Sequence, residues 1–361
     1  LWQNPYSVAR YAGVPLWSDA YFEAMRPVMK MLADAGQKSV TATIMNRPWN
    51  GQTEDAFGSM VTKIRRIDGT WLYDYTIFDR WVEFMFSLGI DRQINCYSMI
   101  PWALEFDYYD QATSSNTTIQ ATPGSPEYNE YWGSFIANFA THLKSKGWFE
   151  KTMIAMDERP MESMQAVLTL IRKIEPDFKI SLAGNYHEPI NYEITDFSEG
   201  FGPMKEFPES AKAKRKELGL ITTFYTCCAE AYPNLFVISD PDEAAWLGWF
   251  AQTENYDGYL RWAYNSWTLD PLTDTRFRTW PAGDCFVVYP GGRGSIRFAK
   301  LTEGIQDFEK VRILRAQWQK DGDEAKLSQL AEILKPFTSE KILEEGPTKA
   351  LTTAKSFLDR Q

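Results

Sequence analysis

Short apolar runs alternate along the chain with segments in which apolar residues recur every three or four positions. The first pattern indicates strands and the second amphipathic helices, and their alternation predicts a parallel sheet covered by helices. The predicted strands are residues 39–45, 92–99, 152–156, 179–184, 194–197, 220–227, 258–264 and 285–290. We therefore predict an α/β fold, a (β/α)8 (TIM) barrel with loop insertions. Leu1 and Trp2 form a candidate ninth strand, so this stub, 194–197 or 285–290 would lie outside the ring.

The predicted helices carry start and stop signals. An apolar stripe over residues 160–175, with spacings of three and four, ends before Pro176. Asp240 and Glu243 match a capping box at the start of a further helix. More helices are predicted at 296–359. Because no linker or internal repeat divides the chain, we predict a single domain.

Two insertions interrupt the alternation, at residues 50–76 and 101–125. The first contains Asp68 and Gly69 between alternating runs, which is a strong hairpin signal. Both insertions follow a predicted strand and precede a predicted helix. In a barrel they would rise above the carboxyl ends of the strands, where proteins of that fold bind their ligands.

Composition and charge narrow the classes of partner. The 361 residues include 48 acidic and 38 basic side chains, a formal charge of −10, which would repel a phosphate backbone, so we predict no nucleic-acid partner. With only His142 and His187, and no HExxH or Cys/His cluster, we predict no metal and no cofactor. No apolar run is long enough for a membrane span. The redox state of the four cysteines and the oligomeric state stay open.

Two adjacent carboxylates, Asp157 and Glu158, end the apolar run "TMIAM" and precede Arg159 and Pro160. One interpretation is a helix start, because acidic groups there interact favourably with the helix dipole, by ~0.3 to 1 kcal/mol. The other is a stressed acid pair, because a strand that breaks into its loop can turn both side chains toward the barrel mouth. Two close carboxylates cannot both ionise cheaply, so one pKa rises, as a general acid near neutral pH requires.

Other predicted strand ends carry aromatic and hydrogen-bonding side chains at matching positions. Aromatic rings suit the faces of sugars, and Asn, His and Tyr suit their hydroxyl groups. The candidate catalytic residues are Asp157 and Glu158. The candidate substrate-binding residues are Trp49, Asn185, Tyr186, His187, Tyr225, Trp262, Tyr264, Asn265 and Trp267. The alternative for each of the latter is packing in the core or in a loop.

The position of the pair restricts the mechanism of a sugar-cleaving site. Inverting glycosidases hold their two carboxyl groups ~6.5 to 9.5 Å apart and conventional retaining ones ~5 to 5.5 Å apart, across the sugar. Neighbours in sequence reach one side of a sugar but hardly its opposite faces. We infer that Glu158 donates the proton, while Asp157 orients a nucleophile on the substrate itself, such as a 2-acetamido oxygen.

Three segments carry a resemblance to a known family: "LWQNPYSVARYAGVPLWS", "MDERP" and "YPGGRGSIRFAKLTEGIQDFEKVRIL". They resemble glycoside hydrolase family 123, the β-N-acetylgalactosaminidases, over essentially the whole chain. The resemblance implies a (β/α)8 catalytic domain that removes terminal β-linked N-acetylgalactosamine from glycans or glycolipids. It also implies retention of configuration through an oxazoline intermediate, with Asp157 stabilising the acetamide and Glu158 as general acid and then base. The preference for N-acetylgalactosamine over N-acetylglucosamine rests on the resemblance alone.

The start of the chain indicates a fragment, because "LWQNPYSVARYAGV" has neither an initiator Met nor a signal segment. Family members typically carry a β-sandwich domain before the barrel, and we expect that domain upstream. We also expect the address signal there, with an extracytoplasmic location, periplasmic or secreted.

Two other hypotheses stay open. A conventional retaining β-glycosidase would use Glu158 as acid/base and Glu188 or Glu230 as a separate nucleophile. A carbohydrate-binding barrel would use the aromatic residues without catalysis. Cys227 and Cys228 have no histidine near them in the sequence, so we do not assign them as nucleophiles.

Overall fold

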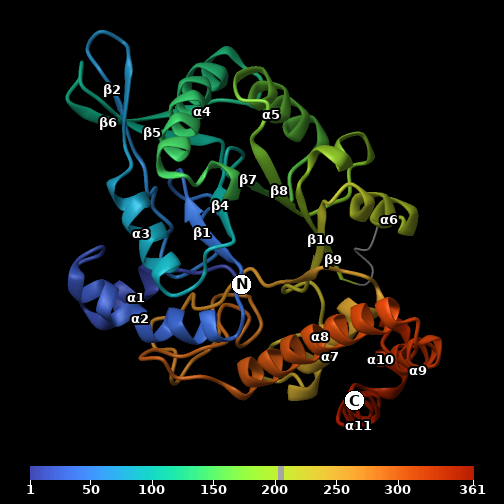
Figure 1. Cartoon of the computed structure of the whole chain (residues 1–361). Helices are drawn as coiled ribbons and strands as arrows, with labels where there is room; N and C mark the ends of the chain where they lie inside the picture. The colour runs from blue at the N-terminus through green and yellow to red at the C-terminus, as the bar shows by residue number, and fades with distance from the viewer. Residues whose placement is uncertain (202–206) are drawn as a thin grey trace.

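Seven parallel strands form the main sheet of the computed structural model, which describes residues 1–201 and 207–361. The strands follow the order β1-β4-β7-β8-β9-β10-β11, and the sheet curls with helices on its outside (Figure 1). Their bounds are β1 Ser39–Thr43, β4 Gln93–Tyr97, β7 Thr152–Asp157, β8 Lys179–Ala183, β9 Asp196–Gly200, β10 Ile221–Tyr225 and β11 Gly258–Leu260. The predicted α/β fold with a parallel sheet is confirmed.

The helices begin and end at recognisable signals. Asp240 accepts a hydrogen bond from the backbone of Asp242, and Glu243 accepts one from the backbone of Asp240, which confirms the predicted capping box of α7. The α-helices are α1 Pro5–Ala12, α2 Asp19–Asp34, α3 Thr76–Ser87, α4 Pro126–Lys146, α5 Met161–Ile174, α6 Glu209–Glu217, α7 Pro241–Thr253, α8 Ile296–Asp321, α9 Glu324–Leu334, α10 Ser339–Glu345 and α11 Thr348–Leu358. Two short 3-10 helices are η1 Phe149–Lys151 and η2 Glu188–Glu193.

The predicted closed barrel is found only in part, because the described residues form a curled half-barrel of seven strands. Residues 285–290 are not a parallel strand. They pair locally with the loop after β11: Ser266 donates its N–H to the Cys285 carbonyl at 3.0 Å, and Val287 donates to the Tyr264 carbonyl at 2.9 Å. These residues are apolar because they are buried, and a short apolar run predicts burial without predicting a strand.

The first three residues of the chain lie between the two edges of this sheet. The Trp2 backbone donates to the Arg261 carbonyl at 3.0 Å and its carbonyl accepts from the Tyr264 N–H at 2.9 Å, just beyond β11. Toward β1 the connection is made by a side chain: Gln3 Oε1 accepts the Thr41 N–H at 2.7 Å. The segment thus joins β11 to β1 without forming a regular strand.

The two predicted insertions meet in a second sheet of order β3-β2-β5-β6. It consists of β2 Thr62–Arg65, β3 Trp71–Asp74, β5 Glu105–Asp110 and β6 Ser115–Gln120. The predicted hairpin at Asp68 and Gly69 joins β2 and β3, and Gly69 has a φ of 81°, which favours glycine. Figure 1 shows this sheet rising beside α4, at one side of the half-barrel.

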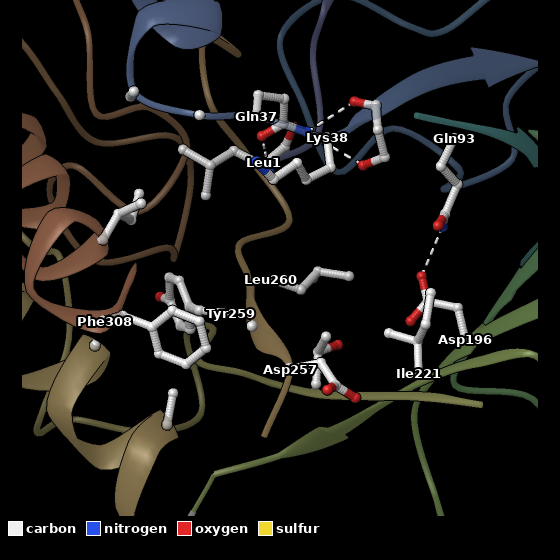
Figure 2. A pocket seen from close by; sticks show the side chains of 18 of the residues that line it. Leu1, Gln37, Lys38, Gln93, Asp196, Ile221, Asp257, Tyr259, Leu260 and Phe308 are labelled. Atoms are coloured by element: carbon white, nitrogen blue, oxygen red, sulfur yellow. Dashed lines mark hydrogen bonds between the residues drawn. The ribbon is translucent and has the colours of Figure 1, made fainter. Parts of the chain in front are cut away.

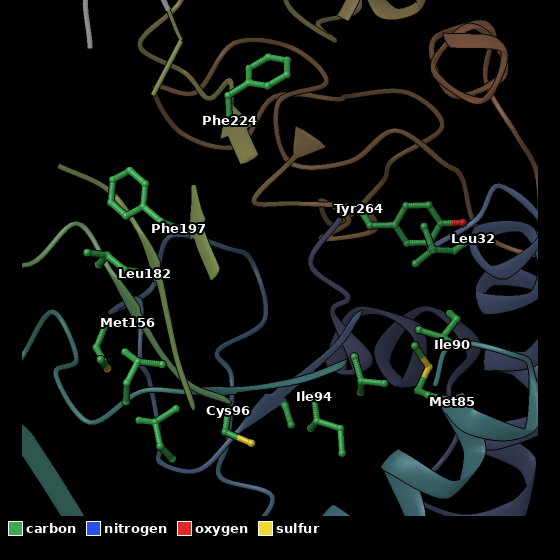
Figure 3. Packing of buried hydrophobic residues seen from close by; sticks show 14 of the residues in the cluster. Leu32, Met85, Ile90, Ile94, Cys96, Met156, Leu182, Phe197, Phe224 and Tyr264 are labelled. Atoms are coloured by element: carbon green, nitrogen blue, oxygen red, sulfur yellow. The ribbon is translucent and has the colours of Figure 1, made fainter. Parts of the chain in front are cut away.

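The main core lies between the sheet and its helices. Alternate strand residues such as Ile94, Cys96 and Leu182 are buried against helical side chains such as Met85 (Figure 3). The opposite faces of the strands point into the half-barrel and are more polar. Gln93 of β4, for example, donates to a carboxylate oxygen on β9 at 2.6 Å.

A cavity of about 550 Å³ opens at the amino ends of the strands, between the sheet and helices α2, α7 and α8 (Figure 2). Its lining includes the first residues of five strands, Ser39, Gln93, Asp196, Ile221 and Gly258. It therefore lies at the end of the sheet opposite to Asp157 and Glu158, which lie where β7 ends.

Candidate active site

The carboxylate pair lies where β7 ends. Asp157 is the last residue of β7, Glu158 follows it, and both are half-buried. Helix α5 begins after Pro160, which makes no side-chain cap. Oδ1 of Asp157 accepts the backbone N–H of Glu158 at 2.9 Å. The pair thus precedes α5 without capping it through a side-chain hydrogen bond.

Asp157 accepts hydrogen bonds on both carboxylate oxygens. Oδ2 accepts the indole N–H of Trp102 at 3.0 Å, in addition to the backbone contact at Oδ1. Burial raises the pKa of Asp157 to about 6, and the charge of Glu158 contributes to the rise. The Trp102 hydrogen bond and the charge of Arg159 act in the opposite direction. Asp157 therefore ionises as the pH rises through about 6.

Glu158 is positioned by two other strands. Tyr225, the last residue of β10, donates its hydroxyl to Oε1 of Glu158 at 2.8 Å. Burial and the charge of Glu158 raise the pKa of Tyr225, so the phenol keeps its proton and remains a donor. Gly184, just after β8, approaches so closely that a Cβ atom there would lie 2.8 Å from Cα of Glu158. The side chain and backbone of Glu158 are thus both located by neighbours.

A stacked pair forms the rim beside Asp157. The guanidinium carbon of Arg159 lies 4.4 Å from the ring centroid of Trp102, which is 43% exposed. Nε of Arg159 donates to the backbone carbonyl of Asp157 at 3.2 Å. The predicted site residue His187 joins this group, because its Nε2 lies 3.0 Å from the Arg159 carbonyl oxygen.

Trp49 lies in a cluster of aromatic rings inside the half-barrel. Its ring centroid is 4.9 Å from that of Trp2 and 5.0 Å from that of Tyr97, and Ala155 of β7 packs in the same cluster. Burial, with a contribution from the charge of Asp157, raises the pKa of Tyr97, so the cluster extends to the carboxylate pair. The buried indole N–H of Trp49 bonds to no described residue.

The remaining candidates near this cluster differ in exposure. Trp262 packs against the cluster, and its indole N–H donates to Oδ1 of Asp284 at 3.3 Å. In the loop after β8, Asn185 is exposed, and Tyr186 is half-buried with its ring 4.7 Å from that of Phe207. These three remain candidates for substrate contact.

Three predicted binding residues are instead tied into the scaffold. Tyr264 is buried and donates its hydroxyl to the Val28 carbonyl at 2.8 Å, and Trp267 donates its indole N–H to the Val288 carbonyl at 2.8 Å. Asn265 exchanges hydrogen bonds with the backbone of Asn4. Their polar groups are occupied by the protein itself, so we leave them out of the proposed site.

Two residues of the site were not among the predictions. Trp102 lies in the second insertion, where composition alone does not show which side chain turns toward β7. Gly184 ends the run "KISLAG", and a glycine at a strand end was a usable signal for a close backbone approach.

Within the described residues no group of three His, Cys, Asp or Glu could hold a metal ion. No described helix has the length and apolar character needed to cross a membrane.

Cleavage of a glycosidic bond requires a carboxyl group that can donate a proton and a second group that stabilises the charge developing on the sugar. Neighbouring carboxylates at the carboxyl end of a curled parallel sheet, beside aromatic rings, are groups of the kind that glycoside hydrolases use. The family follows from sequence comparison. The model of the glycoside hydrolase 123 catalytic domain matches residues 2–314, so the chain belongs to glycoside hydrolase family 123.

A solved structure agrees with this assignment. A family 123 glycoside hydrolase from Clostridium perfringens, described for glycolipid glycan hydrolysis, is 31% identical with a TM-score of 0.88. The alignment covers 99% of this chain and 69% of that one. The β-galactosidase of Bacillus circulans sp. alkalophilus is 12% identical with a TM-score of 0.44, covering 82% of this chain and 54% of its own, too distant to carry an argument. A comparison with curated proteins finds no match.

Proposed function

We propose that this chain is the catalytic part of an exo-acting, retaining β-N-acetylgalactosaminidase that works by substrate assistance. Its substrates would be glycans or glycolipids with a terminal β-linked N-acetylgalactosamine. Family membership and the glycolipid glycan hydrolysis described for the Clostridium perfringens relative support the substrate class. The observation that carries the mechanism is the separate positioning of two sequence-adjacent carboxylates.

The different partners of the two carboxylates match two different roles. Asp157 is held by N–H donors from Trp102 and Glu158, and an ionised carboxylate in that setting can accept the N–H of a 2-acetamido group. Glu158 is held through one oxygen by the Tyr225 hydroxyl. Its carboxyl group can then carry a proton to a glycosidic oxygen.

In the proposed reaction, Glu158 protonates the glycosidic oxygen as the bond from that oxygen to C1 breaks. The acetamide carbonyl oxygen forms a bond to C1 from the opposite face, giving an oxazoline or oxazolinium ring, while Asp157 accepts the hydrogen bond of the acetamide N–H. A water molecule then attacks C1 and gives a proton to Glu158, and the ring opens. Two displacements at C1 retain its configuration.

A conventional double displacement is the second candidate. Glu230 is buried, and burial raises its pKa. Its Oε2 accepts the Cys227 N–H at 2.7 Å, whereas its buried Oε1 bonds to no described residue. A nucleophile across the mouth would need such a free oxygen. Glu188, the other candidate nucleophile, is exposed at the start of η2.

The substrate assignment is tested with nitrophenyl β-glycosides of N-acetylgalactosamine, N-acetylglucosamine and galactose. We expect turnover of the first to exceed the other two, and an N-acetylgalactosamine thiazoline to inhibit strongly because it mimics the cyclised intermediate. Equal turnover of the galactoside would contradict substrate assistance. Trapping of a fluorosugar on Glu230, detected by peptide mass, would establish the second candidate instead.

Replacement of each carboxylate separates the two roles. Glu158→Gln should lower kcat by ~10² to 10⁴ on natural glycosides, and much less on nitrophenyl glycosides, whose leaving group needs little protonation. Asp157→Asn should lower kcat on both kinds of substrate, because the acetamide loses its acceptor. Glu188→Gln and Glu230→Gln serve as matched controls and should stay near the wild-type rate. A Glu158→Gln variant with unchanged turnover would show that Glu158 is not the general acid. Binding of glycan by the wild type without any hydrolysis would favour a carbohydrate-binding barrel.

A further inference from the structure

Two of the four cysteines are adjacent and reachable at the end of β10. Cys227 and Cys228 are free and half-buried, whereas Cys96 and Cys285 are free but fully buried. Burial raises the pKa of both buried thiols. Only the adjacent pair combines access with a second sulfur next to it, and the proposed reaction uses neither sulfur.

The pair lies in the loop that follows β10. Side chains of consecutive residues point apart in a strand, but β10 ends at Tyr225 and the chain bends at Cys228. The Cys227 backbone is anchored at both of its polar groups. Its N–H donates to Glu230 at 2.7 Å, and its carbonyl accepts from Nδ2 of Asn234 at 2.7 Å.

The two thiols interact with each other. A hydrogen bond from the Cys227 thiol lowers the pKa of Cys228, and the same bond raises the pKa of Cys227. The two thiols are therefore coupled to each other. A dithiol in this arrangement needs little rearrangement to bind one atom with both sulfurs.

The pair lies beside the candidate active site. Tyr225, two residues before Cys227, hydrogen-bonds to Glu158, and the charge of Cys227 contributes to the raised pKa of that tyrosine. On the other side, Asp284 influences the pKa of Cys228 and accepts the indole N–H of Trp262. A group bound to both sulfurs would thus stand next to residues that line the site.

We propose that Cys227 and Cys228 form a vicinal dithiol site for a trivalent thiophile of the arsenoxide class, and that occupying it blocks the catalytic mouth. Two arsenic–sulfur bonds form, the arsenic–oxygen double bond is lost, and the two thiol protons leave with that oxygen as water. No oxidant or reductant is consumed. The block, but not the binding, rests on the proposed hydrolase function.

Phenylarsine oxide is the probe. Intact mass should show one adduct on the wild-type chain, removed by 2,3-dimercaptopropanol but not by an equal concentration of a monothiol. Because the second arsenic–sulfur bond closes within the protein, Cys227→Ser and Cys228→Ser should each need ~10² times more reagent for the same occupancy. The controls Cys96→Ala and Cys285→Ala should bind as the wild type does.

Activity is measured on the same samples. Wild-type hydrolysis of the preferred nitrophenyl glycoside should fall at least ~10-fold as the adduct forms, because the adduct would occupy space beside the active site that the substrate needs. Addition of 2,3-dimercaptopropanol should restore the rate. Both serine variants should keep their rate at the reagent concentration that inactivates the wild type. Adduct formation that persists in Cys228→Ser, or full turnover with the adduct in place, would overturn the proposal. If no glycoside is cleaved, the mass measurement alone still decides the dithiol site, so the two failures are distinguishable.

Discussion

Single side chains set the charge of the candidate acid pair. Asp157 is half-buried beside Glu158, which would favour its neutral form, and the Trp102 N–H opposes that tendency. The charge of Arg159 also lowers the pKa of Asp157, and the charge of Asp157 in turn raises the pKa values of Tyr97 and Tyr225. In the proposed reaction, Trp102 is therefore a positioning residue that helps Asp157 to stay ionised in the pH range where the acetamide would need an acceptor.

Trp102→Phe tests this role. The substitution keeps a ring for Arg159 but removes the donor that lowers the pKa of Asp157, so that pKa should rise above about 6. The acid limb of kcat/KM should move to higher pH by ~0.5 to 1 unit, the equivalent of a hydrogen bond of ~1 kcal/mol.

The control is Trp71→Phe in β3, whose buried indole N–H bonds to no described residue. Its acid limb should match that of the wild type. An unshifted acid limb in Trp102→Phe would show that the contact with Asp157 does not control ionisation.

At the scale of elements, the site depends on how closely neighbouring strands approach. β7 and β8 pair in parallel up to Asp157 and Ala183, and the residues just beyond them, Glu158 and Gly184, then nearly touch. No side chain beyond glycine fits between them without moving the Glu158 backbone. The loop after β8 therefore sets the position of the proposed acid without bonding to its carboxyl group.

Gly184→Ala should displace Glu158, because the new Cβ would meet its Cα at 2.8 Å and its N at 3.0 Å. Misplacement of a catalytic group by an ångström costs ~10²-fold, so we expect kcat to fall ~10- to 100-fold. The matched control is Gly133→Ala in α4, where the nearest atom would be Ile174 Cδ1 at 3.5 Å, an ordinary contact. It should leave kcat unchanged, and thermal melts should show both variants folded. Wild-type kcat in Gly184→Ala would contradict the argument.

At the scale of the whole molecule, the half-barrel depends on contacts between distant parts of the chain. The Leu1–Gln3 segment connects the region after β11 with β1, so residues about 260 positions apart share one set of backbone hydrogen bonds. Gln3 is fully buried and supplies by its side chain what a regular strand would supply by its backbone.

Gln3→Ala should therefore destabilise the fold. It leaves the buried Thr41 N–H without its acceptor, which costs ~1 to 3 kcal/mol. Chemical denaturation measures the loss, and hydrogen exchange should show faster exchange at the Thr41 amide. The control is Gln37→Ala, a half-buried neighbour that also bonds to the Ser39 carbonyl at 2.8 Å. It should cost less and leave Thr41 protected, and equal losses would contradict the role given to Gln3.

The sequence predicted correctly those features that depend on interactions between residues close together in the chain. The predicted parallel sheet, the hairpin at Asp68 and Gly69 and the capping box of α7 are confirmed, because periodicity, turn residues and caps act over a few positions. An apolar run shows that a segment is buried but does not distinguish a strand from an irregular segment. The predicted strand 285–290 was wrong for this reason, because the segment is buried but irregular.

At the candidate site, too, the sequence predicted what is local in the chain and missed what depends on distant contacts. Family membership was readable from motifs and is confirmed, and the adjacency of Asp157 and Glu158 is a property of the chain itself. Their partners are not: Trp102 comes from an insertion and Tyr225 from a strand 67 residues further on. A strand-end position alone also placed Trp267 among the candidates, although its indole N–H bonds to the backbone of Val288.

The sequence by itself determined most of the elements, the family and the two adjacent carboxylates, because local backbone preferences and motif identity need no knowledge of distant contacts. Only the tertiary structure decided that the sheet is a half-barrel bridged by Leu1–Gln3. It also decided that Asp157 is desolvated, which raises the pKa of Asp157 to about 6. Desolvation and hydrogen bonding depend on which side chains surround a group in space, and those neighbours come from β10, an insertion and the loop after β8.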